Sequence, residues 1–344
     1  MTTRTRYFVI ASLLVLLVGV GTGLVAYYAG FPMSAFTSAG GPDELRFVPS
    51  NATLVAYANV QEVMGSNLRQ RLRRVIPDEP TGQKELQNQT GINIETDIDR
   101  VVGCFAPPVN GGTGFPGTGL VMARGRFDAV KIEALMREHG ALVEDYKGTR
   151  LIVADVHPNG DASAGTDTRR NDTLSVAFIE PGLVALGSTP LVRNAIDLKS
   201  GGDNVTANEE IMNLVRTLDS GNAWAVGRFD ALTSQAKLPS ELAQRLPPIT
   251  WFSATTHING GFSGVFRAET RDEASATNLR DVVRGFLALA KMQVGPRPEL
   301  QAMVQSLQLG GTGTTVALSF DVPAAVFDLL DGTIKELAPK QPGI

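Results

Sequence analysis

The hydrophobic pattern divides the chain into one uncharged N-terminal stretch and a longer remainder in which short apolar runs alternate with turn residues. Residues 7–31 read YFVIASLLVLLVGVGTGLVAYYAGF and contain no charged side chain. Because about 20 apolar residues suffice for a helix to cross a bilayer, this stretch predicts a transmembrane anchor. Arg4 and Arg6 precede it, which predicts a cytoplasmic N-terminus and a body on the opposite side of the membrane.

Two further features of this region bear on its interpretation. A cleaved signal peptide is the alternative, but its apolar core spans only about 7–15 residues. The nearest small-residue cleavage site, Thr37-Ser38-Ala39, lies well beyond the stretch. Gly19 and Gly23 form one G-x-x-x-G spacing, which would let two membrane helices approach closely in a homodimer; the alternative is that glycine is simply frequent in membrane helices. Residues 32–44 then form a linker to the folded body.

Beyond the linker, apolar strands that end in Asn or Asp lead directly into amphipathic segments. The side chain at such a junction can accept hydrogen bonds from the free N–H groups of the first helical turn. We therefore predict helix caps at Asn59, Asp128, Asp230 and Asp321. The helices that they begin are expected over residues 60–76, 129–139, 231–236 and 322–337.

The strands are separated by turn residues, which predicts hairpins over residues 142–154, 174–187 and 249–270. Hairpins indicate an α+β fold with antiparallel sheets, and we expect the helices to cover one face of each sheet. Residues 45–155 are predicted to form a first module, and the polar residues 156–172 a flexible loop. Residues 173–338 contain the order hairpin, two helices, strand and capped helix twice, which predicts an internal duplication. Residues 339–344 form a tail.

Composition and charge narrow the class of protein. The 344 residues include 31 Lys and Arg against 35 Asp and Glu, a formal net charge of −4. This mild acidity argues against general nucleic-acid binding. Cys104 is the single cysteine, so no intrachain disulfide forms, and its apolar neighbours predict a buried thiol.

Two motifs match cofactor or metal patterns only in part. Residues 112–117 match G-x-G-x-x-G, but a strand follows where a nucleotide fingerprint needs a helix N-terminus. Residues 155–161 resemble the start of a calcium loop, but His157 stands at its third position. Thr166 stands at the twelfth, where a calcium loop needs a bidentate Glu. We therefore predict no cofactor and no metal.

One group of acidic residues supports an alternative function. Glu95, Asp97 and Asp99 would share a face if the segment is extended. Paired carboxylates of this kind would suit a membrane-anchored hydrolase. Ile94 and Ile98 on the opposite face favour an ordinary strand entry instead. The histidines have no partner at metal or triad spacing: His139, His157 and His257.

One basic cluster follows the anchor. Arg69, Arg71, Arg73 and Arg74 lie on the helix expected over residues 60–76. They are candidates for contact with anionic lipid or with an anionic surface polymer. The alternative is a solvated helix face, balanced by the two acidic residues that follow.

An anchor, a short linker and repeated strand–Asp–helix units resemble uncharacterised exported, single-anchor envelope proteins of Gram-negative bacteria. The resemblance rests on residues 90–93 (TGIN), 97–102 (DIDRVV) and 124–128 (RGRFD). It implies no activity. We therefore expect a non-enzymatic periplasmic protein that binds or scaffolds in the envelope. Its expected partners are the bilayer, through residues 7–31, and an envelope protein or polymer.

Overall fold

The computed structural model describes residues 41–70, 87–107, 119–155, 173–219, 221–229, 248–257, 261–293, 298–322 and 326. Several predicted features lie outside these residues: the anchor at 7–31, most of the linker, the motif at 112–117, the loop at 156–172 and the tail at 339–344. Within the described part of the chain, no helix is long and apolar enough to span a membrane.

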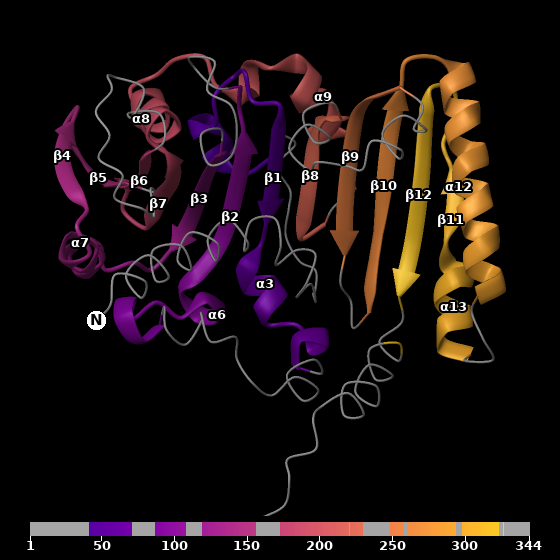
Figure 1. Ribbon diagram of the computed structural model, residues 1–344, viewed down its shortest axis with the longest axis horizontal. Coiled ribbons are helices and arrows are strands. Elements are labelled where there is room, and N and C mark those ends of the chain that lie inside the picture. The colour runs from indigo at the N-terminus through magenta and orange to yellow at the C-terminus, as the bar shows by residue number, and fades with distance from the viewer. Residues whose placement is uncertain are drawn as a thin grey trace, which may run out of the picture.

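The described strands join one 12-stranded antiparallel sheet (Figure 1), which confirms the predicted α+β class. Across the sheet their order is β11-β12-β10-β9-β8-β1-β2-β3-β7-β6-β5-β4. Along the chain they are β1 (Leu54–Ala58), β2 (Ile98–Phe105), β3 (Gly119–Gly125), β4 (Leu142–Tyr146), β5 (Thr149–Asp155), β6 (Thr173–Glu180), β7 (Leu183–Ser188), β8 (Ala223–Arg228), β9 (Ile249–His257), β10 (Phe262–Thr270), β11 (Gln308–Gly310) and β12 (Thr315–Val322).

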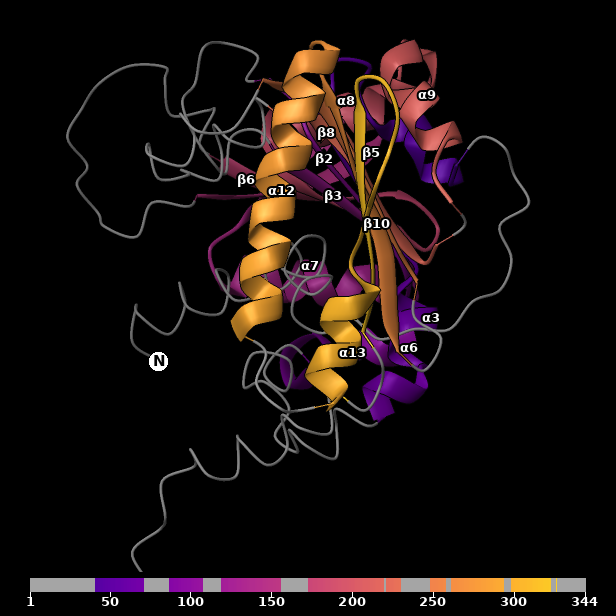
Figure 2. The same cartoon turned by 90° about the vertical axis from the view of Figure 1, so that its right-hand side faces the viewer.

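Helices lie on both faces of this sheet, so the prediction of one covered face is wrong. One face carries η1 (Asp43–Phe47), α8 (Thr189–Leu198), η3 (Val205–Ala207) and α9 (Glu209–Arg216). The other carries α3 (Val60–Met64), α6 (Ile94–Asp97), α7 (Ala129–Glu138) and α12 (Glu273–Gln293), and α13 (Pro298–Ser306) packs against β12 and α12. Figure 2 shows α9 and α12 on opposite sides of the strands.

The physical reason is that several strands are apolar on both faces. In β3, Leu120 and Met122 enter one core, whereas Val121 and Ala123 enter the other. Successive side chains of a strand point to opposite faces, so a continuous apolar run needs cover on both sides. The hairpins alone predict cover on one face, whereas these apolar runs require cover on both faces.

The predicted helix over residues 60–76 is interrupted. α3 ends at Met64, and Gly65 is its C-cap. Ser66 then begins a new helical segment, because its hydroxyl accepts a hydrogen bond from the Arg69 N–H at 3.0 Å. A Gly–Ser pair is a stop signal followed by a start signal, and apolar periodicity alone does not detect it.

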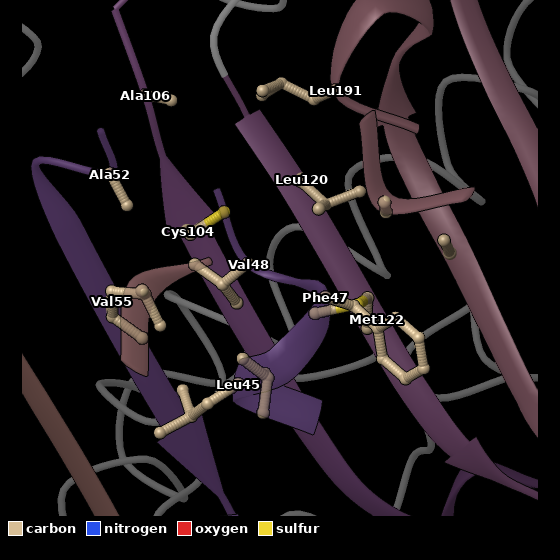
Figure 3. Packing of buried hydrophobic residues seen from close by; sticks show 14 of the residues in the cluster. Leu45, Phe47, Val48, Ala52, Val55, Cys104, Ala106, Leu120, Met122 and Leu191 are labelled. Atoms are coloured by element: carbon tan, nitrogen blue, oxygen red, sulfur yellow. The ribbon is translucent and has the colours of Figure 1, made fainter. Parts of the chain in front are cut away.

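The larger core lies between the sheet and the helices on the η1 side of it. Figure 3 shows Leu45, Phe47 and Val48 directed toward the strands β1, β2 and β3, where they meet Val55, Cys104 and Met122. Although η1 is a single short turn, its apolar side chains are among the least exposed in the described residues. η1 includes Asp43 and Glu44, the last two residues of the predicted linker, so the segment from Asp43 to β1 is part of the folded body.

Buried ion pairs fix η1 to the sheet. The Glu44 carboxylate is buried and accepts hydrogen bonds from Arg100, at 3.0 Å, and from Arg124. Arg124 also reaches Glu180 at 3.4 Å, and Glu180 pairs with Arg46 at 2.6 Å. Burial acts to raise the pKa of Glu44, but the two arginines outweigh it and the pKa lies below its ordinary value.

The two predicted modules share this sheet. The segment 156–172 connects β5 and β6, which are paired neighbours. The hairpin, the two helices and the strand of the expected order recur, as β6-β7-α8-α9-β8 and as β9-β10-α12-α13-β11-β12. The helix expected at 231–236 lies outside the described residues, and Val322, the expected start of the other, lies in β12. The pairing does not recur, because β12 returns to β10 whereas β8 pairs with β1 and β9. The two units are therefore not equivalent in space.

Replacing Glu44 by Gln should lower the free energy of unfolding by about 3 kcal/mol, the lower end of the cost of breaking a buried ion pair. The lower end applies because Arg100 and Arg124 are partly exposed. Urea denaturation measures the change. Glu209→Gln, which breaks the exposed pair with Arg216, is the control and should cost less than about 1 kcal/mol. Equal costs would contradict the role of Glu44.

The contribution of Glu44 should depend on pH. Its folded pKa lies below the ordinary value of 4.5, so its stabilisation is complete above that value and is lost as the pH falls through the folded pKa. The difference in urea midpoint between wild type and Glu44→Gln should be full at neutral pH and shrink in acid. A difference that grows on acidification has the wrong sign for this mechanism.

The Cys104 thiol should be unreactive in the folded protein. The structure confirms the predicted burial, which raises the pKa of the thiol to about 12. Because the thiolate is the reactive form, Ellman's reagent at mildly alkaline pH should label Cys104 only after urea is added. Rapid labelling of the native protein would show that the thiol is accessible.

Candidate functional site

The predicted helix caps fall into three groups. Asn59 accepts a hydrogen bond from the Glu62 N–H at 3.1 Å, and Asp128 accepts one from the Lys131 N–H at 3.0 Å. Asp230 lies outside the described residues. Asp321 lies inside β12, which continues to Val322.

The structure places Arg69 inside the body. Its side chain is buried, and its guanidinium lies 2.7 Å from the Glu95 carboxylate. Arg69 therefore does not contribute an exposed charge to the predicted basic cluster. Arg71, Arg73 and Arg74 lie outside the described residues, so their contact with an anionic surface stays a prediction.

The three alternating carboxylates do not share a face. The segment expected to be extended forms the short helix α6, which contains Glu95 and Asp97, while Asp99 lies in β2. Glu95 pairs with Arg69, and Asp97 accepts a hydrogen bond from the Asn93 N–H at 2.9 Å. Capping of α6 by Asn93 was the missed signal. These contacts are structural.

The described histidines are also apart. His139 is the C-cap of α7, and its Nδ1 lies 2.7 Å from the Leu135 carbonyl oxygen. His257 ends β9, where burial lowers its pKa against an opposing effect of Asp219. His157 lies outside the described residues. In the part of the chain that the structure describes, no three acidic, histidine or cysteine side chains are grouped to hold a metal.

A pocket of about 610 Å³ lies where the β4–β5 hairpin meets α8. Its apolar wall includes Leu142, Val153 and Leu191, with Pro49 and Pro107 from two connecting segments. Volumes of this size are typical of small-molecule and side-chain pockets. It is our candidate functional site.

Charged side chains and one aromatic ring border the pocket. The Tyr146 hydroxyl donates to Asp197 at 3.2 Å, and Lys147 pairs with the same carboxylate at 2.6 Å. The Arg193 guanidinium lies over the Tyr146 ring, 5.3 Å from its centroid, and pairs with Glu144. The border therefore offers both positively and negatively charged hydrogen-bonding groups around an apolar wall.

Local sequence explains how this border is built. Lys147 and Gly148 form a two-residue turn with positive φ at both positions (51° and 77°), the geometry that a tight hairpin requires. Asp145 supports the turn by accepting from the Gly148 N–H at 3.1 Å. The turn positions Tyr146 and Lys147 opposite Asp197 in α8.

The start of α8 is fixed by hydroxyl groups. Thr189 Oγ1 lies 2.6 Å from the Thr173 hydroxyl and 2.8 Å from the Ser175 hydroxyl. Pro190 follows in the first turn of the helix, where its fixed φ is favourable. α8 thus presents Leu191, Arg193 and Asp197 to the pocket from a rigid base.

β4 is the last strand at its end of the sheet, and no described strand pairs with its outer edge. In a hairpin closed by a two-residue turn, the pair Tyr146–Thr149 is hydrogen-bonded, and bonded pairs alternate with open ones. The backbone groups of Val143 and Asp145 therefore face outward. The side chains of Leu142, Glu144 and Tyr146 line the pocket.

The pocket is better suited to binding than to acid–base chemistry. It contains two carboxylates, Glu144 and Asp197, and each is paired with a cation. A hydrolase needs one carboxyl group that donates a proton and another that activates water or attacks the substrate. Two carboxylates engaged separately by Arg193 and Lys147 do not present that arrangement.

Comparisons with known proteins assign no family. No protein-family model matches the chain, and no curated protein sequence matches it. The crystal form I structure of TP0453 matches with a TM-score of 0.48 and 10% sequence identity, covering 86% of this chain and 98% of that chain. A likeness of this size supports no conclusion about function.

Proposed function

We propose that the protein is a non-enzymatic binding protein, anchored in the bacterial inner membrane and facing the periplasm, that holds an extended segment of an envelope protein along β4. The anchor is residues 7–31, and Gly19 and Gly23 are the expected contact of an anchor dimer. One observation carries the binding proposal: an open strand edge and an amphipathic pocket lie along the same strand.

An added strand would use both features together. Its backbone would pair with the outward groups of Val143 and Asp145, which supplies affinity without regard to sequence. Alternate side chains of the added strand would point to the pocket face, where Leu142 and Leu191 offer apolar contact. Arg193 and Glu144 would favour added strands whose neighbouring polar side chains complement their charges.

The alternative is a membrane-anchored periplasmic hydrolase with a carboxylate-based site. Among the described carboxylates, Glu144 and Asp197 would be the candidates for such a site, because both line the pocket. Their cation partners argue against it. The scaffold proposal therefore takes precedence, and contact of Arg71, Arg73 and Arg74 with an anionic surface is a secondary proposal.

Placing the photo-crosslinking residue p-benzoylphenylalanine at Leu142 should yield a discrete adduct in native membranes, because a bound segment would cover this side chain. The matched control is Val130 on α7, since the two side chains are similarly exposed, at 75% and 80%. Adducts are separated by electrophoresis and identified by mass spectrometry. Equal yields at the two positions would argue against a binding edge.

A second variant makes the result specific to strand addition. Val143→Pro removes an outward N–H while leaving the hydrogen bonds between β4 and β5, and proline is tolerated at such edge positions. Val143→Ala removes a similar apolar contact but keeps the N–H. The Leu142 adduct should be lost with proline and retained with alanine. Retention of the Leu142 adduct in both variants would contradict the strand-addition mechanism.

A further inference from the structure

The two ends of the sheet are built differently. At one end, β4 leaves the backbone groups of Val143 and Asp145 facing outward. At the other end, β11 and α13 lie beside β12 (Figure 1). β11 has only three residues, so it pairs with less than half of the eight-residue β12. Side chains must close the rest of the β12 edge if it is to be closed at all.

The hydrogen-bond pattern shows which backbone groups of β12 face away from β10. The Thr270 N–H donates to the Thr314 carbonyl oxygen at 3.0 Å, directly before β12 begins. Because bonded and open positions alternate along an antiparallel pair, the even-numbered residues of β12 face β10 and the odd-numbered ones face outward. The outward residues are Thr315, Ala317, Ser319 and Asp321.

The first three outward positions are occupied. Ala317 and Ser319 pair with two residues of β11. The Thr315 N–H donates to the Thr312 carbonyl oxygen at 3.0 Å, within the turn that joins the two strands. The Thr315 carbonyl oxygen accepts a hydrogen bond at 2.9 Å from Arg280, which reaches it from α12. A side chain therefore closes the edge on one side of β11.

Ser306 closes the last outward position, on the other side of β11. The Asp321 N–H donates to the Ser306 hydroxyl at 2.9 Å, and the same hydroxyl lies 2.6 Å from the Asp321 carbonyl oxygen. The hydroxyl also lies 2.7 Å from the Met303 carbonyl oxygen in α13. Ser306 thus joins the last turn of α13 to β12 and occupies the backbone groups that an added strand would need.

A second copy of the chain carries a strand that would otherwise fit this edge. Every copy presents the outward groups of β4, and β4 has five residues against three in β11. A free β4 would therefore offer β12 more backbone pairs than β11 does. Pairing β4 of one copy with β12 of the next is a head-to-tail contact, which generates open chains of molecules unless the rotation closes a ring.

We propose that Ser306 and Arg280 lock β11 over the edge of β12 and so prevent β4 of a second copy from adding there. The lock leaves each chain with a single edge that accepts a strand. This inference rests on the open edge of β4 that also carries the proposed function, but it does not depend on which segment β4 holds.

The test compares the full-length protein in detergent with Ser306→Ala combined with Arg280→Gln. In sedimentation velocity, the double variant should form species several-fold larger than wild type at the same concentration, and their size should grow with concentration. Comparison with wild type removes any contribution of the anchor. Ser306→Thr, which keeps the hydroxyl, is the control and should sediment like wild type.

Circular dichroism checks the fold of each variant, and Ser306→Ala alone, which removes a single hydroxyl, is measured as well. If folded Ser306→Ala and the folded double variant both sediment like wild type, the lock is wrong. Adding Val143→Pro to the double variant should abolish the larger species, because β4 then lacks an outward N–H, whereas Val143→Ala should retain them. Larger species that survive Val143→Pro overturn the proposal, since they use another surface.

The crosslinking experiment at Leu142 separates this proposal from the proposed function. If the Leu142 adduct forms in native membranes but the double variant sediments like wild type, binding at β4 stands and the lock is wrong. If no adduct forms but the double variant assembles through β4, the lock stands and the proposed function is wrong.

Discussion

The position of β1 is the constraint on which the rest of the structure depends. It lies between β2 and β8 and pairs with both along its whole length, so it joins the strands of the first half to those of the second. Tyr57 of β1 stacks on Trp224 of β8, with ring centroids 5.7 Å apart. Without β1, the sheet would divide into two. One part would contain β2, β3, β7, β6, β5 and β4, and the other β8, β9, β10, β12 and β11, each with an open edge where β1 had been.

The remaining elements secure this central strand. η1 immediately precedes β1 and packs its apolar side chains over it, while Glu44 holds η1 to β2 and β3 through Arg100 and Arg124. The sheet is well covered near β1, whose Val55 and Tyr57 lie in the larger core. Cover decreases toward the ends of the sheet, where the pocket beside β4 and the exposed Phe286, Leu289 and Met292 of α12 lie.

Local signals in the sequence predicted much of this fold. The three hairpins, the α+β class and the burial of Cys104 follow from turn residues and apolar runs, and the structure has them. η1 was not predicted, because its five residues are too few to show a helical periodicity and two of them fall in the predicted linker. The place of β1 between β2 and β8 was not predictable either, because the sequence of a strand does not specify which distant strand it pairs with.

The pocket shows the same limit. Leu142, Glu144 and Tyr146 alternate in the sequence and could be assigned to one face of a strand. Their meeting with Arg193 and Asp197 depends on the packing of α8 over the hairpin, which is a tertiary contact. The expected shared face of Glu95, Asp97 and Asp99 is absent for a local reason: Asn93 caps α6 and removes the extended geometry that a shared face requires.

The pairing of β1 with β8 has a consequence for how the protein is made. Leu54 pairs with Gly227, so one edge of β1 stays unpaired until the chain has been synthesised past β8. A nascent chain that has already formed β1 to β7 would carry an open, apolar strand edge in the middle of its future sheet. Such edges are prone to mispairing, and long-range pairing is slow. Correct folding of this protein therefore depends on keeping this edge of β1 away from other strand edges until β8 has been synthesised.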